Sequence, residues 1–179
     1  MPMELVTGRL RLRPWQISDA EDVHALWAER DPRSLHMIDA HGKPTVDDLR
    51  SDIERQLAAT AETGLALLAV ERCDGDAFIG YCGLIVGRAS WDQPEIAFEL
   101  FRRAHGHGYA TEAGEAIVAA AAETGRARLW STVRAWNQPS LRVLEKLGFV
   151  QSGQVTHDAE RGDLVWLARD LASRNAAAA

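Results

Sequence analysis

A short turn with two glycines holds the residues best suited to bind a ligand. Arg103 to Gly108 reads RAHGHG, follows an apolar run, and leads at once into a helical pattern that starts at Tyr109. The first backbone amides of a helix have no partners within it, and the helix dipole adds positive charge at that end. Glycines at 106 and 108 let the backbone bend and come close to a phosphate. The pattern predicts an anion-binding turn; the alternative is that its glycines serve only a tight connection.

Two common phosphate-binding motifs do not fit this turn. The Rossmann fingerprint requires G-x-G-x-x-G after the first strand, whereas this turn lies past the middle of the chain and has no third glycine at that spacing. A P-loop is absent because no Gly-Lys-Ser/Thr follows.

Two carboxylates precede the turn on one predicted strand. Alternation along a strand puts Glu95, Ala97 and Glu99 on one face, and the apolar residues between them on the other. Carboxylates on a buried face are costly unless that face meets water or a cation. A carboxylate can accept a proton from an ammonium group, directly or through water. We expect Glu99 to do so, whereas Glu95 either assists or lies exposed at the strand entrance.

A second candidate segment begins the last predicted helix. Asn137 is followed by Pro139, an order typical of a helix cap with a proline in the first turn. Asn137 can also contact a cofactor or an amine while it caps the helix. Ser140 lies in the same turn, where surface or capping chemistry is its ordinary role.

Arg103, Gly106 and Gly108 match the pattern Q/R-x-x-G-x-G/A. The turn thereby resembles the pyrophosphate loop of the GNAT (Gcn5-related N-acetyltransferase) superfamily. Four segments resemble its ribosomal-protein alanine acetyltransferase branch (RimJ/RimL type): TGRLRLRP at 7–14, GHGYATEA at 106–113, NQPS at 137–140 and LEKLGF at 144–149. The resemblance spans roughly residues 5 to 170.

The resemblance implies that acetyl-CoA binds with its pyrophosphate on the loop amides and its pantetheine in a gap where the fourth and fifth strands splay apart. In the family, a β-bulge usually accompanies the splay in the fourth strand, and it would break the alternation described above. The implied cofactor-binding residues are Phe98, Leu100, Phe101, Arg103, Ala104, His105, Gly106, His107, Gly108, Tyr109, Ala110, Asn137 and Ser140.

The family often has a tyrosine four residues after Ser140 that protonates the leaving thiolate, but this chain has Leu144 there. The departure leaves Ser140 or water as the proton donor, with Glu99 and Glu95 as the other candidate catalytic residues. The expected reaction is direct acetyl transfer to a primary amine, on a protein N-terminus or a small molecule, in a ternary complex. One rival is a non-catalytic acyl-CoA-binding or sensing module, and another is a different phosphate-ligand enzyme.

Strand and helix patterns alternate along the chain around these residues. Strands are predicted over 5–12, 65–70, 78–86, 95–101, 129–133, 149–155 and 164–169, and helices around 21–27 and 46–62, over 109–123 and after 137. The order β-α-α-β-β-β-α-β-α-β-β predicts a mixed α/β fold in a single domain, 1–179, with a core of about 5–170 and an alanine-rich tail at 175–179. The GNAT fold implies a central twisted, mostly antiparallel sheet, splayed between strands four and five and flanked by helices.

Composition narrows the classes of partner. The chain has 20 Lys and Arg against 26 Asp and Glu, and its net charge of -6 argues against a nucleic-acid partner. An acidic protein suits a cationic substrate instead. The first 13 residues contain no apolar run typical of a signal peptide, and no stretch reaches membrane-spanning length. We therefore expect a cytoplasmic protein with no membrane partner, and the sequence leaves a homodimer open.

Neither metal nor cysteine chemistry is expected. His105 and His107 are two residues apart with no Cys or carboxylate at ligand spacing. Cys73 and Cys82 lie outside any metal-ligand or redox spacing, and we interpret both as small buried hydrophobic residues.

Overall fold

The computed structural model describes residues 4–34, 36–75 and 77–171, so the predicted tail at 175–179 lies outside the described residues. The strands are β1 (Leu5–Val6), β2 (Leu10–Arg13), β3 (Leu67–Arg72), β4 (Phe78–Ile85), β5 (Glu95–Leu100), β6 (Arg128–Arg134), β7 (Val150–Thr156) and β8 (Leu164–Asp170). The α-helices are α1 (Ala20–Ala28), α2 (Val46–Thr63), α3 (Tyr109–Glu123) and α4 (Gln138–Lys146).

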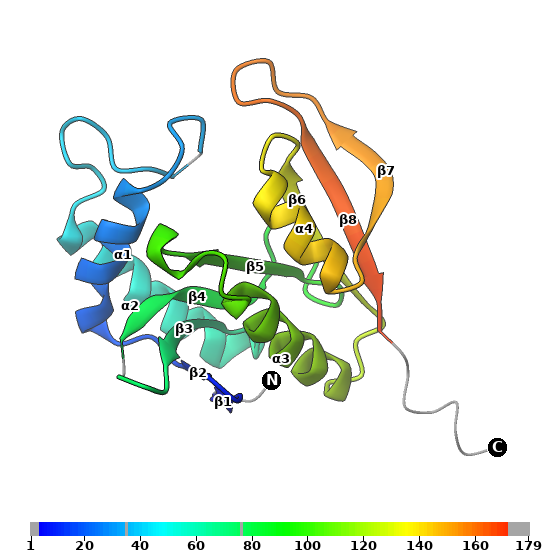
Figure 1. The fold of residues 1–179 in the computed structure, drawn as a ribbon, viewed down its shortest axis with the longest axis horizontal. Coiled ribbons are helices and arrows are strands. Elements are labelled where there is room, and N and C mark those ends of the chain that lie inside the picture. Colours follow the sequence, from blue (N-terminus) through cyan, green and yellow to red (C-terminus); the bar gives the residue numbers. More distant parts are fainter. Residues whose placement is uncertain (1–3, 35, 76, 172–179) are drawn as a thin grey trace.

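The strands form one sheet in the order β1-β2-β3-β4-β5-β6-β8-β7 (Figure 1). Every neighbouring pair is antiparallel except β5 and β6, which are parallel. The predicted mixed α/β fold with a mostly antiparallel sheet is therefore confirmed.

The sheet opens between β5 and β6, the fourth and fifth strands of the sequence prediction. The ladder between them holds a single residue pair, Glu95 with Trp130, at the start of β5. Two side-chain bonds add to it, from the Ser131 hydroxyl to the Ile96 carbonyl at 3.2 Å and from the Thr132 hydroxyl to the Glu95 carboxylate at 2.7 Å. Toward their carboxyl ends the two strands diverge, and in Figure 1 β6 and β8 run steeply away from β5. The predicted splay is thus confirmed.

Helices cover both faces of the sheet because alternate residues of a strand point to opposite sides. On β3, Leu68 lies in the cluster that also contains Ile117 of α3 and Leu144 of α4. Its neighbour Ala69 lies in a second cluster, with Leu49 of α2. The helices α3 and α4 therefore pack on one face of the sheet, and α1 and α2 pack on the other.

The single strand predicted over 5–12 is wrong: two strands lie there instead. β1 and β2 pair antiparallel, with Leu5 opposite Leu12. Thr7 closes the turn between them, since its backbone N–H donates to the Leu10 carbonyl at 2.8 Å and its hydroxyl accepts from the Leu10 N–H at 3.0 Å. The alternation of Leu10 and Leu12 with arginines holds only over 9–13, and the prediction extended it back across Thr7 and Gly8, where the chain turns. The turn leaves Arg9 exposed at its end.

No β-bulge interrupts β5, in contrast to what the resemblance implied. Its pairing with β4 runs without a register shift from Glu95 opposite Ile85 to Leu100 opposite Gly80. The alternation predicted for this strand therefore holds. Ile96 and Leu100 are buried in the cluster beneath α3, and Glu95 and Glu99 occupy the other face.

The cysteine prediction is half right. Cys82 is fully buried on β4, and burial raises the pKa of its thiol to about 12. Cys73 is exposed, because it lies in the turn after β3 rather than inside the strand. In the part of the chain that the structure describes, no helix is long and apolar enough to cross a membrane.

Candidate active site

The loop before α3 presents a series of unpaired backbone amides. Gly106 and Gly108 adopt φ values of 79° and 80°, in the left-handed region that favours glycine. The first hydrogen bond of α3 runs from the Glu112 N–H to the Gly108 carbonyl at 3.0 Å. Among the described residues, the backbone amides of 106–111 have no acceptor. Consecutive free amides at a helix start form a concave site for an anion.

The space above the glycines is open. A Cβ atom placed on Gly106 would meet no heavy atom within 4 Å, and one on Gly108 would lie 3.6 Å from Arg9 Nη2. A side chain at either position would not clash with the protein, but its backbone would be strained at this φ, and it would project into the open space beside the amides. Both glycines thus suit close contact between the backbone and a ligand.

The side chains of Arg103 and His105, two other predicted cofactor-binding residues, contact backbone carbonyls of the protein. Arg103 donates to the Phe78 carbonyl at 3.3 Å, and its guanidinium stacks on Phe101 at 3.7 Å. His105 Nε2 lies 2.9 Å from the Leu100 carbonyl oxygen. The side chains of Leu100, Phe101 and Ala104 are buried in the protein core, so only their backbone atoms can reach a ligand.

Glu99 is held by two partners that sequence analysis missed. Arg30, which follows α1, donates from Nε to Oε1 at 2.8 Å and from Nη2 to Oε2 at 2.5 Å. The Tyr81 hydroxyl donates to Oε2 at 2.5 Å. Of the two conditions given for a carboxylate on a buried face, water or a cation, the cation is therefore present beside Glu99.

Tyr81 and Arg30 differ in how well a sequence could have identified them. Tyr81 lies directly opposite Glu99 on β4, so a known strand register would have paired them. No local pattern links Arg30 to a residue 69 positions later. Burial raises the pKa of the Tyr81 hydroxyl above its ordinary value and the charge of Glu99 raises it further, while Arg30 opposes the rise. Tyr81 therefore stays protonated at neutral pH and acts as a donor.

Glu95 is buried, so the alternative of an exposed carboxylate at the strand entrance is wrong. Only 4% of the residue is accessible. The Thr132 hydroxyl of β6 donates to Oε2 at 2.7 Å, and the backbone N–H of Arg88 donates to Oε1. It lies four positions before Glu99, or about 13 Å along a strand. The two carboxylates are too far apart to contact the same amine.

Asn137 lies between β6 and α4, and Ser140 lies in the first turn of α4, both on the β6 side of the opening. The Asn137 side chain accepts from the Ser140 N–H at 3.3 Å, and Pro139 lies in the first turn. The predicted helix cap is thus present, and it leaves the Ser140 hydroxyl out of the capping bond. Leu144, at the position where the family often has tyrosine, is fully buried.

A profile of the acetyltransferase (GNAT) domain matches residues 9–150 of the chain. The protein belongs to the GNAT acetyltransferase family. The matched region contains the glycine loop, both sides of the opening, and all the candidate residues named above.

Similar proteins agree with this assignment. The uncharacterized N-acetyltransferase p20 of Bacillus licheniformis is 24% identical over 163 residues, covering 90% of each chain. The ribosomal-protein-S5-alanine acetyltransferase from Vibrio fischeri superimposes with a TM-score of 0.78 at 15% identity, covering 95% of this chain and 97% of that one. The ribosomal L7/L12 α-N-protein acetyltransferase RimL, solved with coenzyme A, gives 0.77 at 16% identity, covering 93% and 97%. At these identities the solved structures show a shared GNAT fold.

Three connections of this GNAT domain meet at Trp136, just after β6. Arg33, from the segment between α1 and α2, stacks on Trp136 at 4.1 Å. Trp136 Nε1 in turn donates to the Arg161 carbonyl at 2.7 Å, in the connection between β7 and β8. The same connection is fixed by an ion pair between Arg134 and Asp158 at 2.9 Å.

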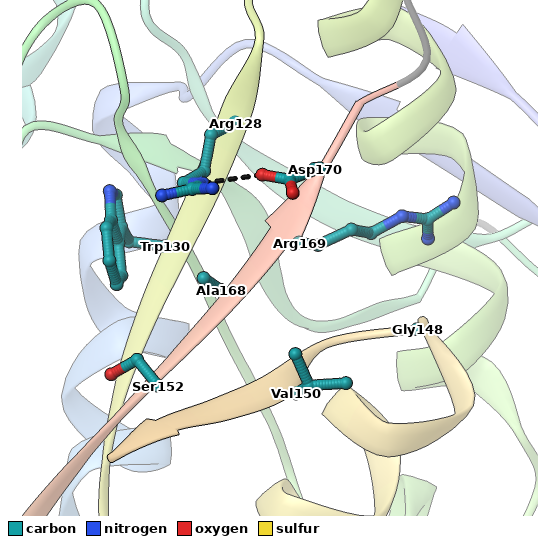
Figure 2. Close-up of a pocket in the computed structure, with 8 residues that line it drawn as sticks. All are labelled: Arg128, Trp130, Gly148, Val150, Ser152, Ala168, Arg169 and Asp170. Atoms are coloured by element: carbon teal, nitrogen blue, oxygen red, sulfur yellow. Dashed lines mark hydrogen bonds and ion pairs between the residues drawn. The ribbon is translucent and has the colours of Figure 1, made fainter. Parts of the chain in front are cut away.

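A groove of about 460 Å³ lies elsewhere in the GNAT domain, on β6, β8 and the start of β7. Figure 2 shows Trp130 and the ion pair of Arg128 with Asp170 along it, while the Arg169 side chain points away toward the helices. It contains no residue of the glycine loop and none of the predicted site residues. We therefore place the candidate active site at the opening between β5 and β6.

Proposed function

We propose that this protein transfers an acetyl group from acetyl-CoA to a primary amine while both substrates are bound. The observation that carries the proposal is the run of unpaired amides at 106–111 beside an opening in the sheet of a GNAT domain. A pyrophosphate fits such amides by hydrogen bonding and by the helix dipole. The pantetheine would follow β5 into the opening, with Asn137 and Ser140 on the far wall.

Glu99 is the proposed acceptor of the amine proton, directly or through an ordered water. Its Oε2 already accepts from Arg30 and Tyr81, whereas Oε1 accepts from Arg30 Nε alone. A carboxylate oxygen has two lone pairs, so Oε1 retains capacity for a water or an amine. Glu95 is already engaged by Thr132 and by the Arg88 backbone, and it would act only by holding the strand.

The proposed transfer needs no covalent enzyme intermediate. The neutral amine nitrogen attacks the thioester carbon and loses a proton to water as the C–S bond breaks. The thiolate takes a proton from water or from Ser140, which then regains one from water. Cys82 is buried with a raised pKa, and Cys73 lies in the turn between β3 and β4, so neither is placed as a nucleophile.

The acceptor is proposed as a class, namely a protein N-terminus or a small-molecule amine. The solved RimL is named for acetylation of a protein α-amino group, which supports the first alternative for this chain. The non-catalytic module remains the rival, because it would use the same loop without Glu99.

An acceptor screen with thiol detection tests the proposal. Peptides with free N-termini and small primary amines are incubated with acetyl-CoA, released CoA is measured, and the acetylated product is identified by mass spectrometry. We expect CoA and acetylated amine in equal amounts. Binding of acetyl-CoA without amine-dependent CoA release across the screen would favour the binding module. Stabilisation by a nucleotide but not by acetyl-CoA would favour a different phosphate-ligand enzyme.

A further inference from the structure

Arg9, at the turn between β1 and β2, is tied to the first turn of α3. Its Nε donates to Glu112 Oε2 at 2.7 Å, and its Nη2 lies 2.6 Å from the same oxygen. The other carboxylate oxygen accepts from the Arg9 backbone N–H at 3.0 Å and from the Thr7 hydroxyl at 2.6 Å. Both oxygens of Glu112 are therefore occupied by the N-terminal hairpin.

The same guanidinium also reaches the glycine loop. Arg9 Nη1 donates to the His107 carbonyl at 3.0 Å, and its Cζ lies 4.7 Å from the centre of the Tyr109 ring. The His107 and Tyr109 rings stack at 5.5 Å. One arginine thus contacts the loop backbone, the first residue of α3, and a carboxylate one turn into that helix.

The bond to His107 fixes the direction of a loop amide. The His107 carbonyl and the Gly108 N–H belong to one planar trans peptide group, in which the two point in opposite directions. Holding the carbonyl toward Arg9 therefore aims the Gly108 N–H away from the hairpin. Glycine populates several backbone conformations, so the loop sequence alone does not hold this peptide in one orientation.

The ion pair also removes an electrostatic conflict. Glu112 lies in the first turn of α3, where its charge would repel a pyrophosphate bound at the helix start. Its side chain is 18% exposed and faces the hairpin, where Arg9 compensates its charge.

We propose that Arg9, braced by Glu112, is a positioning residue that orients the 107–108 peptide group for the pyrophosphate of acetyl-CoA. The inference rests on the proposed function. The Arg9 guanidinium binds two groups at once. Nε and Nη2 contact the Glu112 carboxylate, and Nη1 donates to the His107 carbonyl. Lysine has a single charged nitrogen and cannot reproduce both contacts.

Two acyl donors separate positioning from general structural support. S-acetylpantetheine lacks the pyrophosphate, so a loop that binds pyrophosphate does not contribute to its use. For Arg9→Ala and Arg9→Lys we expect the KM for acetyl-CoA to rise by roughly tenfold to a hundredfold, as for loss of a charged hydrogen bond, with turnover at saturation nearly unchanged. Kinetics with S-acetylpantetheine should stay within about twofold of the parent.

Arg11→Ala is the matched control. Arg11 is an exposed arginine of the same hairpin that pairs with Glu4 at 2.9 Å, so its removal changes the net charge equally. It should leave the KM for acetyl-CoA unchanged. Glu112→Gln provides a second, smaller perturbation that removes the brace, and we expect it to raise the KM in the same direction as Arg9→Ala.

Three outcomes would overturn the inference. Parental KM values in folded Arg9→Ala and Glu112→Gln would show that the contact does not matter for the cofactor. Equal losses with both acyl donors would indicate a structural role only. A parental KM in Arg9→Lys beside a raised KM in Arg9→Ala would show that Arg9 acts by charge. Failure of the parent to bind acetyl-CoA would instead overturn the proposed function itself, and this inference with it.

Discussion

Tyr81 and Glu99 face each other across β4 and β5, and the tyrosine hydroxyl donates to Glu99 Oε2 at 2.5 Å. Arg30 completes the arrangement by donating to both carboxylate oxygens. Glu99 therefore enters any reaction as part of a three-residue network rather than as a lone carboxylate. Variants of this residue have to be compared with variants of its partners.

The first prediction concerns proton removal by Glu99. Glu99→Gln should lower turnover by about a hundredfold or more, with little change in acetyl-CoA affinity, because glutamine cannot accept the proton. The defect should be largest at lower pH, where more of the amine is protonated. Tyr81→Phe is the control, since it removes a hydrogen bond to Oε2 and leaves Oε1 in place; we expect only a few-fold loss. A pH–rate profile of Glu99→Gln that matches the parent would remove Glu99 from the mechanism.

The second prediction concerns the stability of the Arg30–Glu99 pair. The side chains are only 13% and 22% exposed, so removing one partner leaves a poorly solvated charge. Arg30→Met should lower the free energy of unfolding by about 1–3 kcal/mol, and the same change in a Glu99→Gln background should cost less. Urea unfolding of the four proteins gives the coupling energy. Strictly additive effects would show that the pair contributes no coupling.

The third prediction concerns the leaving thiolate. Ser140→Ala should reduce turnover by roughly tenfold to a hundredfold without abolishing it, as expected for losing a hydrogen bond to a charged sulfur. The helix cap should survive, because Asn137 accepts from the Ser140 backbone N–H and not from its hydroxyl. Steady-state turnover at saturating acetyl-CoA, with a good acceptor, is the measurement. Parental turnover where chemistry limits the rate would mean that water alone protonates the thiolate.

The fourth prediction concerns pH and the contact between Arg9 and Glu112. Partial burial raises the pKa of the Glu112 carboxyl, but hydrogen bonds from Thr7 and Arg9 outweigh this effect, so the net pKa lies below the ordinary 4.5. Such a carboxyl stabilises the protein above its unfolded-state pKa and loses that contribution as the pH falls through the folded-state value. Between about pH 5 and pH 3, the parent should therefore lose stability more steeply than Glu112→Gln. Parallel profiles in urea unfolding would contradict the assignment.

Local patterns were enough to predict the parts of the site that one segment builds. The glycine loop follows from Gly106 and Gly108 at a helix start, and the cap at Asn137 follows from its proline. The alternation that puts Glu95 and Glu99 on one face also held, because β5 pairs with β4 without a bulge.

Local sequence patterns could not predict the contacts between distant segments. Arg30 and Glu99 are 69 residues apart, and Arg9 and Glu112 are 103 apart, so no periodicity connects either pair. The hairpin that places Arg9 was missed because the alternation at 9–13 was extended across Thr7 and Gly8, where the chain turns. The sequence left the burial of Glu95 undecided because its partner Thr132 comes from β6. The pairing of β5 with β6 at Glu95 is not visible in the sequence of either strand.

The most direct test of the account is calorimetric titration of acetyl-CoA into the parent, Gly106→Leu and Gly125→Leu. Gly106 and Gly125 have φ values of 79° and 78°, and a Cβ on either meets nothing within 4 Å, so both variants carry a similar backbone strain of about 1–2 kcal/mol. Gly125 lies in the turn after α3, far along the chain from the loop. The account predicts parental affinity for Gly125→Leu and at least about a hundredfold weaker binding for Gly106→Leu, which blocks the loop amides. Equal affinity for all three folded proteins would contradict it.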